Sequence, residues 1–250
     1  MDDLPNQTPP LSLADVGIII PALNEEESLR ILLPQLTAMQ VGQIVVADNG
    51  STDRTAEVAR SSGVTCVHEP KRGYGAACWA GMKALAPSIR AVAFLDADLS
   101  DDANYLHNLL ARLNEGYDLV VSTRIAAMQE SGSMTLPQRI GNVLMPTLIR
   151  LGWGFRYTDL GPFRIIRREP LDSMQMQDRD FGWTIEMQIR AVEMGIRIVE
   201  LPVPYRKRKG TSKISGTIRG VYLATYWILR TCTGMWLTKS RRRDSRMLER

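Results

Sequence analysis

Short apolar runs alternate with amphipathic segments along the first half of the chain. Runs of β-branched residues are typical of strands covered on both faces, and we expect such strands at 16–21, 43–48, 65–68, 91–96 and 118–123. The segments between them have apolar residues at helical spacing. We expect helices at 26–39, from a cap at Ser51 or Thr52 to about 62, at 75–85 and at 104–115. This alternation predicts an α/β fold with a doubly wound, mostly parallel sheet.

The second half of the chain is less regular. Residues 125–138 are polar without periodicity, so we expect a mobile loop there, and we expect helices at 136–151 and 183–194 and strands within 158–168 and 196–202. A basic loop at 203–216 precedes an apolar-rich helix at 217–237. Without a repeat or a clear linker, the pattern predicts one domain over 16–216. A flexible lead at 1–15 would precede it, and an amphipathic helix and basic tail at 217–250 would follow.

Charge is unevenly distributed along the chain. The net charge is +4, but residues 201–250 hold 13 Lys and Arg against two acidic residues, so this end carries +11 and the rest −7. A basic end on an acidic body favours an anionic partner such as phosphate groups, lipid or nucleic acid. Nucleic acid is disfavoured because Tyr205 is the only aromatic residue near the basic loop, and single strands bind through stacked aromatics.

Cysteine usage and the N-terminal sequence both point to the cytoplasm. The three cysteines are far apart in sequence, and their number is odd, so a disulfide framework is not expected. Residues 1–15 have no apolar run of the signal-peptide type. Residues 217–237 come nearest to a membrane span, but Arg219 and Arg230 interrupt them. Their aromatic residues and the KSRRR that follows fit a helix lying on an anionic membrane, although an ordinary core helix has a similar pattern.

Candidate chemistry gathers where the expected strands end, which is the edge where parallel α/β sheets bind ligands. Asp96 and Asp98 follow the AVAFL strand directly, so both carboxylates can reach one point. Hard oxygen ligands suit Mg²⁺ or Mn²⁺, which would bridge a nucleotide diphosphate. An isolated pair of this kind is more often a solvated turn, since Asp is common after strands.

Three further strand ends support a ligand site. They read PALNEE at 21–26, DNGSTD at 48–53 and KRGYG at 71–75. Each has a simpler interpretation as a turn or helix cap, and their coincidence on one edge carries the argument. The first strand is followed neither by the G-x-G-x-x-G of dinucleotide-binding proteins nor by a Walker A loop.

The motifs PALNEE, ADNGSTD, KRGYGAA and DADLSD, in this order, resemble those of the family-two glycosyltransferases. Within that family the chain is similar to the dolichyl- and polyprenyl-phosphate mannose or glucose synthases, over about residues 16–216. The resemblance implies a GT-A-type, Rossmann-like fold and an inverting, metal-dependent hexosyltransferase. The donor would be UDP-glucose or GDP-mannose, and the acceptor a polyprenyl or dolichyl phosphate. Synthases of this kind often carry extra membrane helices, so this chain would be a form peripheral to the cytoplasmic face.

The resemblance also implies roles for individual residues. Asp96 and Asp98 would hold Mg²⁺ or Mn²⁺ and the sugar diphosphate. The nucleoside and phosphates would be bound by Pro21, Ala22, Glu25, Asp48, Lys71 and Gly75. The GPFR segment, with Asp159, Gly161 and Arg164, also looks like the family, and Trp183 and Glu186 would line the sugar pocket. The basic loop, through Arg206, Ser212 and Lys213, would contact the donor diphosphate and the acceptor phosphate.

Two departures from the family pattern bear on mechanism. Ser100 stands where the mannose synthases often have Gln, which leaves the remaining metal ligands open. No Glu-Asp pair occurs in 178–190, where many members place a catalytic base. A phosphomonoester is already anionic near pH 7, so a lipid phosphate could attack without a base. A glycosyltransferase with a soluble acceptor, such as a glucosyl-3-phosphoglycerate synthase, and a non-catalytic nucleotide-sugar-binding protein remain alternatives.

Overall fold

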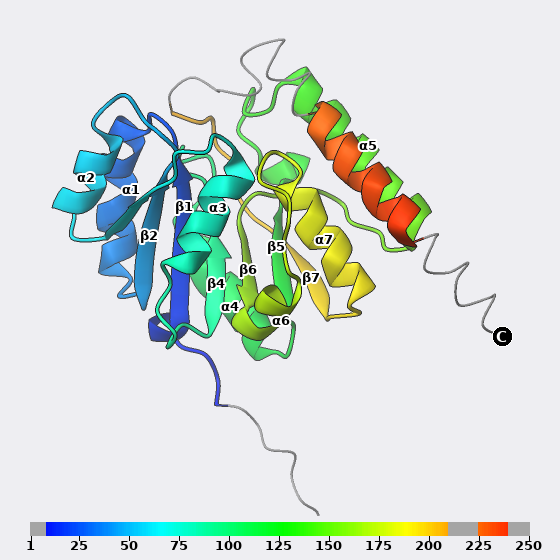
Figure 1. Cartoon of the computed structure of the whole chain (residues 1–250), viewed down its shortest axis with the longest axis horizontal. Coiled ribbons are helices and arrows are strands. Elements are labelled where there is room, and N and C mark those ends of the chain that lie inside the picture. The colour runs from blue at the N-terminus through cyan, green and yellow to red at the C-terminus, as the bar shows by residue number, and fades with distance from the viewer. Residues whose placement is uncertain (1–8, 210–224, 240–250) are drawn as a thin grey trace, which may run out of the picture.

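A seven-stranded sheet lies between two layers of helices in the computed structural model, which describes residues 9–209 and 225–239 (Figure 1). The strand order is β3-β2-β1-β4-β6-β5-β7. β6 runs antiparallel to both of its neighbours, β4 and β5, and every other pair is parallel. The strands are β1 Val16–Ala22, β2 Gln43–Asp48, β3 Thr65–His68, β4 Ala91–Phe94, β5 Leu119–Thr123, β6 Arg164–Arg167 and β7 Ile198–Pro202. The α/β, mostly parallel sheet expected from the sequence is confirmed.

Helices cover both faces of the sheet (Figure 1). They are α1 Glu26–Ala38, α2 Thr55–Ser61, α3 Tyr74–Lys83, α4 Leu106–Asn114, α5 Leu136–Trp153, α6 Arg168–Ser173 and α7 Trp183–Glu193. Short 3₁₀ turns occur at Leu13–Asp15, Ala103–Tyr105 and Ala126–Met128. Residues 225–239 are also helical.

Two hydrophobic cores result from the alternation of side chains along the strands. On β1, Ile18 and Ile20 pack with the leucines of α1 and α4, whereas Ile19 packs with the residues of α3 and α7 on the other face. All three isoleucines are buried. Because β1 is covered on both sides, its sequence is apolar throughout, as the first-half pattern predicted.

The structure differs from the expected elements in four places. α2 begins at Thr55, and the side chain of Asp53, not Ser51 or Thr52, accepts the backbone N–H of Thr55 at 3.0 Å. β4 ends at Phe94, which leaves Asp96 and Asp98 in the turn that follows. Residues 125–138 include a 3₁₀ turn and the start of α5, and α6 was not foreseen from the sequence.

The two ends of the chain are only partly described. Residues 9–15 of the expected flexible lead pack on the domain: Leu11 is buried, and its backbone N–H donates to Asn114 Oδ1 at 2.8 Å. Residues 217–224 and the tail at 240–250 lie outside the described residues. Within 9–209 and 225–239, no helix combines the length and the apolar character that crossing a membrane requires.

Candidate active site

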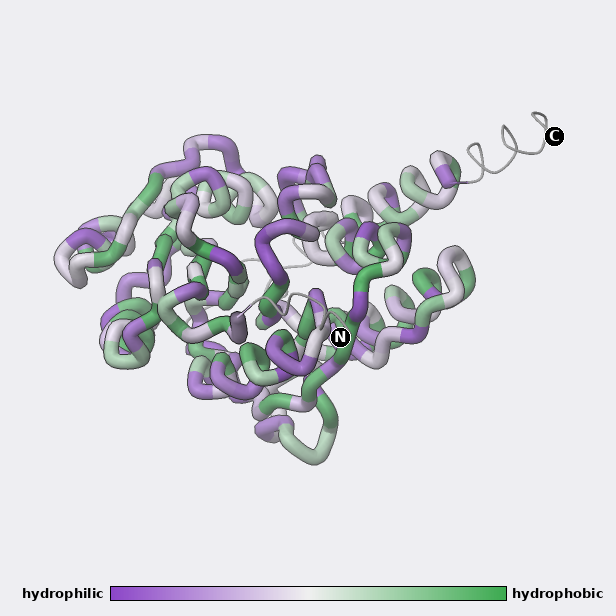
Figure 2. Tube along the Cα trace, turned by 90° about the horizontal axis from the view of Figure 1, so that it is seen from below, coloured by the Kyte–Doolittle hydropathy of each residue, from purple (hydrophilic) through white to green (hydrophobic). Residues whose placement is uncertain are grey.

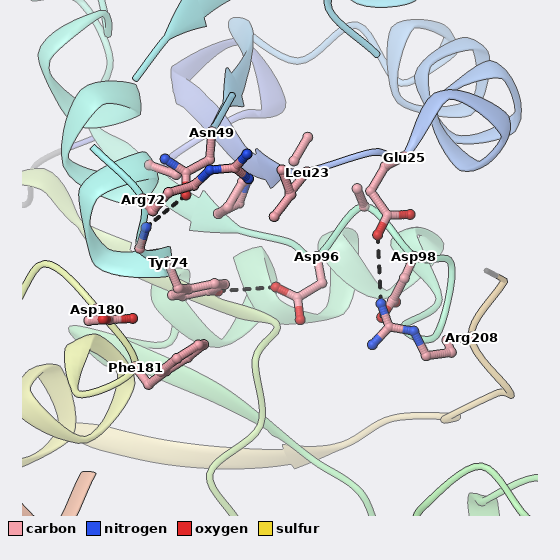
Figure 3. A pocket seen from close by; sticks show the side chains of 15 residues that line it. Leu23, Glu25, Asn49, Arg72, Tyr74, Asp96, Asp98, Asp180, Phe181 and Arg208 are labelled. Carbon is pink, nitrogen blue, oxygen red and sulfur yellow. Dashed lines mark hydrogen bonds and ion pairs between the residues drawn. The ribbon is translucent and has the colours of Figure 1, made fainter. Parts of the chain in front are cut away.

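A pocket of about 320 Å³ opens at the carboxyl edge of β1, β2 and β4 (Figure 3). This is the edge at which ligands bind in sheets of this kind. It brings all four sequence motifs together with two segments from the second half of the chain. The lining residues are Pro21, Ala22, Leu23, Glu25, Asn49, Arg72, Gly73, Tyr74, Ala77, Asp96, Ala97, Asp98, Asp180, Phe181 and Arg208.

The acidic pair lies on one wall of this pocket. Tyr74 donates its hydroxyl to Asp96 Oδ1 at 3.1 Å, and Asp98 Oδ1 accepts the backbone N–H of Ser100 at 3.0 Å and its hydroxyl at 2.6 Å. Burial, and next the repulsion from Asp98, raise the pKa of Asp96 to about 6. Two carboxylates held close together in a buried site favour a bound cation, because a cation offsets both effects.

Arg208 supplies a cation to this wall. Its Nη2 lies 3.3 Å from Asp98 Oδ2 and 3.6 Å from Glu25 Oε1 (Figure 3). The basic loop is held in place by its backbone, since Arg206 N donates to Ser100 O at 2.8 Å and Lys209 N to Asp98 O at 2.9 Å. The sequence favoured Arg206 as the phosphate contact, but the Arg206 side chain points to Asp102 Oδ2 at 2.7 Å and does not line the pocket.

Asn49 organises the loop that carries Arg72. Its amide nitrogen donates to the carbonyls of Glu69 at 3.0 Å and Lys71 at 2.7 Å, and its oxygen accepts the backbone N–H of Gly73 at 2.8 Å. Gly73 has a φ of 142°, and a Cβ there would lie 2.1 Å from the carbonyl oxygen of Arg179. Close backbone approach therefore requires glycine at this position.

Asp48 and Lys71 lie beside the pocket rather than in its lining. The buried Asp48 carboxylate accepts the backbone N–H of Ser51 at 3.0 Å and lies 3.1 Å from His68 Nδ1. Gly75 is in close contact with another loop, since a Cβ on it would lie 2.6 Å from Asp178 O. These groups shape the loops that form the pocket.

Residues 177–181 form the wall opposite the acidic pair and contribute Asp180 and Phe181 (Figure 3). Buried Glu186 supports this loop by accepting the backbone N–H groups of Gln177 and Asp178 at 2.7 to 3.1 Å. Burial, together with the charge of Asp178, raises the pKa of Asp180. Sequence reasoning missed Asp180 because it sought a Glu-Asp pair. The available signal was a carboxylate three residues before the start of α7.

Two other residues to which the family resemblance pointed are buried beneath the site. Trp183 packs edge-on against Phe94 with ring centroids 6.2 Å apart. Arg164 donates to the Pro162 carbonyl at 3.0 Å and to Thr184 Oγ1 at 3.1 Å. Neither side chain lines the pocket, so they support it from below. Ser212 and Lys213 lie outside the described residues.

The donor chemistry of the acidic wall fits Mg²⁺ or Mn²⁺. Asp96 and Asp98 offer hard carboxylate oxygens, and no group of three or more His, Cys, Asp or Glu in the described part of the chain could hold a metal alone. Mg²⁺ commonly uses one or two carboxylates with substrate phosphates and water. The Ser100 hydroxyl is engaged with Asp98, so the remaining ligands would come from a diphosphate and water.

The chain is similar to known glycosyltransferases over most of its length. The sequence model described as Glycosyl transferase family 2 matches residues 17–174. An uncharacterized glycosyltransferase of Mycobacterium tuberculosis is 40% identical over 212 residues, which cover 84% of this chain and 94% of that protein. A dolichyl-phosphate hexose transferase of Haloferax volcanii is 32% identical over 204 residues, which cover 80% of this chain and 86% of that protein.

Solved structures agree with the fold. Glucosyl-3-phosphoglycerate synthase of Mycobacterium tuberculosis, solved with Mn²⁺, UDP and glucosyl-3-phosphoglycerate, superposes with a TM-score of 0.69 at 21% identity, covering 87% of this chain and 80% of that one. The same enzyme was also solved with Mg²⁺ and UDP. The similarity in sequence and fold shows that this chain is a glycosyltransferase of the GT-A fold and belongs to glycosyl transferase family 2.

Proposed function

We propose that this enzyme transfers a hexose from UDP-glucose or GDP-mannose to a polyprenyl or dolichyl phosphate, with inversion at the anomeric carbon and with Mg²⁺ or Mn²⁺. The observation that carries the proposal is the wall formed by Asp96, Asp98 and Arg208. It sets an acidic pair and an arginine side by side at the ligand-binding edge of the sheet. A metal that binds a diphosphate needs carboxylate oxygens such as those of the acidic pair. Phosphate oxygens need a cationic hydrogen-bond donor such as the arginine.

The pocket offers a place for each part of the donor. Pro21, Ala22, Leu23 and Asn49 form one end, where backbone and apolar groups can receive a nucleoside. Asp96 and Asp98 would hold the metal, which neutralises the departing diphosphate when bound. Asp180 and Phe181 face this pair from the opposite wall, where the sugar would lie.

A lipid phosphate acceptor fits the basic end of the chain. The loop at 203–209 carries Arg206 and Arg208 beside the pocket. We propose that Ser212 and Lys213, which follow in the sequence, also contact phosphate. The acceptor oxyanion can then attack the anomeric carbon after positioning and charge neutralisation alone. The similarity to the Haloferax volcanii dolichyl-phosphate hexose transferase supports this acceptor class. Association with the cytoplasmic membrane face, through the C-terminal helix and basic tail, is part of the proposal.

A soluble phosphorylated acceptor is the second candidate. It is favoured by the likeness in fold to glucosyl-3-phosphoglycerate synthase, although that likeness at 21% identity concerns architecture alone.

The test is a transfer assay with radiolabelled donors. Purified enzyme with Mg²⁺ or Mn²⁺ receives UDP-glucose or GDP-mannose, with and without polyprenyl phosphate in detergent, and Asp98→Ala is the inactive control. Label in an organic-extractable, acid-labile product is expected. Donor consumption with a soluble phosphorylated acceptor, and none with the lipid, would refute the lipid proposal and support the second candidate.

A further inference from the structure

The outer side of α5 exposes a continuous apolar stripe. It consists of Leu136, Ile140, Val143, Leu144 and Leu151, of which Val143 and Leu151 are 71% and 78% exposed. At 100° per residue these positions fall within an arc of about 100°. The opposite side of the same helix, with Met145 and Ile149, is buried in the core. Both sides of α5 are therefore apolar. The rest of the domain covers the side with Met145 and Ile149 and leaves the other side exposed.

The helix at 225–239 lies against α5 and exposes further large apolar residues. Lys239 Nζ donates to the Gly152 carbonyl at 2.8 Å and lies 5.5 Å from the ring centroid of Trp153. Tyr226, Trp236 and Leu237 are exposed on this helix. In two perpendicular views the helix lies at the rim of the molecule, away from the sheet (Figure 1, Figure 2). Eight of the eleven exposed large hydrophobic residues in the described part of the chain thus lie on two neighbouring helices.

The exposed threonines on these two helices donate their hydroxyls to backbone carbonyls of the same helix. Thr147 donates to the Val143 carbonyl at 2.6 Å, Thr233 to the Leu229 carbonyl at 2.8 Å and Thr238 to the Gly234 carbonyl at 2.9 Å. A polar group that meets lipid must be satisfied within its own helix. These threonines therefore need no water or protein partner when the surface is covered by an apolar phase.

The charges on the same two helices are all positive. Neither α5 nor 225–239 contains Asp or Glu, while Arg139 and Arg150 border one edge of the α5 stripe and Arg230 and Lys239 lie on the second helix. Tyrosine, tryptophan and cations around an apolar strip are typical of surfaces that lie at an anionic membrane. A symmetric pair of chains would instead bring these cations together, because a two-fold interface opposes the same surface from each copy.

We propose that Leu136, Ile140, Val143, Leu144, Leu151, Tyr226, Trp236 and Leu237 form a docking face for an anionic lipid bilayer. α5, an element of the catalytic domain itself, then contacts the membrane beside the C-terminal segment. The inference builds on the proposed lipid acceptor, because it would hold the pocket close to the surface in which that acceptor is dissolved. It is tested without donor or acceptor.

The test is co-sedimentation of the full chain with vesicles of phosphatidylglycerol and phosphatidylcholine, or of phosphatidylcholine alone. Val143→Gln with Leu151→Gln is expected to lower partitioning by about tenfold or more, because two aliphatic side chains that the bilayer would bury are lost. Arg139→Gln with Arg150→Gln is expected to lower it by about tenfold on the anionic vesicles only. Ile31→Gln on α1 and Met194→Gln directly after α7 replace exposed apolar residues elsewhere on the surface, and these matched controls are expected to bind like the unaltered chain.

Three results would overturn the proposal. They are no binding of the unaltered chain to anionic vesicles, full binding of the Val143/Leu151 variant, or a solution dimer that this variant abolishes in sedimentation equilibrium. Transfer to a short-chain, water-soluble polyprenyl phosphate separates the two proposals. The docking variant is expected to retain it, and vesicle binding without any transfer by the unaltered enzyme would refute the proposed acceptor while leaving the docking face in place.

Discussion

Arg208 Nη2 and Asp98 Oδ2 lie 3.3 Å apart, so a cation of the protein occupies the position beside the acidic pair. The same nitrogen is 3.6 Å from Glu25, which places it between two motifs that follow β1 and β4. A divalent ion bound at Asp98 would lie close to this guanidinium and be repelled by it. The basic loop and the acidic wall are therefore electrostatically linked.

Replacing Arg208 tests this link. In Arg208→Gln, Mn²⁺ without nucleotide is expected to bind about tenfold more tightly or better, since a unit charge at about 4 Å contributes about 1 kcal/mol in water and more near a protein surface. UDP is expected to bind more weakly in the same variant, because one phosphate-facing cation is lost. Isothermal titration measures both constants.

Arg206→Gln is the control for that comparison. Its partner is Asp102 at the surface, and exposed ion pairs contribute about 0 to 1 kcal/mol, so a change below about twofold in Mn²⁺ binding is expected. A larger loss of UDP binding in Arg206→Gln than in Arg208→Gln would instead support Arg206 as the phosphate contact.

Ser100 positions Asp98 through two hydrogen bonds, one from its hydroxyl at 2.6 Å. Ser100→Ala removes that donor and keeps the backbone N–H of Ser100 on Asp98 Oδ1, so the carboxylate is held less firmly. Groups that orient metal ligands typically change metal affinity by about 10- to 100-fold. We expect Mn²⁺ affinity in the presence of UDP to fall by about tenfold, with a smaller change in UDP affinity without metal. Equal effects in both titrations would contradict a role through the metal.

Asp180→Asn distinguishes the two kinds of acceptor. An anionic lipid phosphate needs no proton removed, so the variant is expected to keep more than about a tenth of the transfer rate. General-base catalysis is worth about 10²- to 10⁴-fold, and a loss of that size would indicate a hydroxyl acceptor activated by Asp180. The measurement is kcat with saturating donor and acceptor, with Asp172→Asn on the exposed end of α6 as the control.

Asp101 makes stability depend on pH. Within the described residues, neither carboxyl oxygen of this buried side chain has a hydrogen-bond partner, and burial raises its pKa well above the usual value. Above about pH 4 the Asp101 carboxyl group is therefore still protonated in the folded chain but has lost its proton in the unfolded chain. The free energy of unfolding consequently falls as the pH rises above this value. Asp101→Asn is expected to raise the free energy of unfolding by about 1 kcal/mol or more at pH 7, and by nearly nothing at pH 4, in urea titrations with a metal chelator. Equal gains at both pH values would refute this account.

Thr231 connects the C-terminal helix to the pocket wall. Its hydroxyl donates to Asp178 Oδ2 at 2.7 Å, and Asp178 Oδ1 accepts the backbone N–H of the pocket residue Asp180 at 2.7 Å. Thr231→Val keeps the shape and is expected to raise the donor KM by about three- to tenfold by loosening this loop. Thr233→Val is the matched control, because among the residues that the structure describes its hydroxyl bonds only to carbonyls of its own helix. Equal KM values in the two variants would contradict the connection.

The sequence by itself determined the order of the elements in the first half and the edge at which the chemistry gathers. Buried strands such as β2 and β5 are short, largely apolar runs between turns, so their bounds followed from local pattern to within one residue. Asp96 and Asp98 were found for the same reason, because polar residues directly after a buried strand lie at the binding edge of a parallel sheet.

Only the tertiary structure decided which residues from the second half complete the pocket. Asp180 and Arg208 reach it from segments 84 and 110 residues beyond Asp96 and Asp98, respectively, and no local pattern states which of several charged residues points inward. The same holds for Glu186 and Trp183, which were expected in the pocket and are buried beneath it. Side-chain direction in irregular loops is set by long-range packing, as Gly73 against Arg179 shows, whereas periodicity reports only on regular elements.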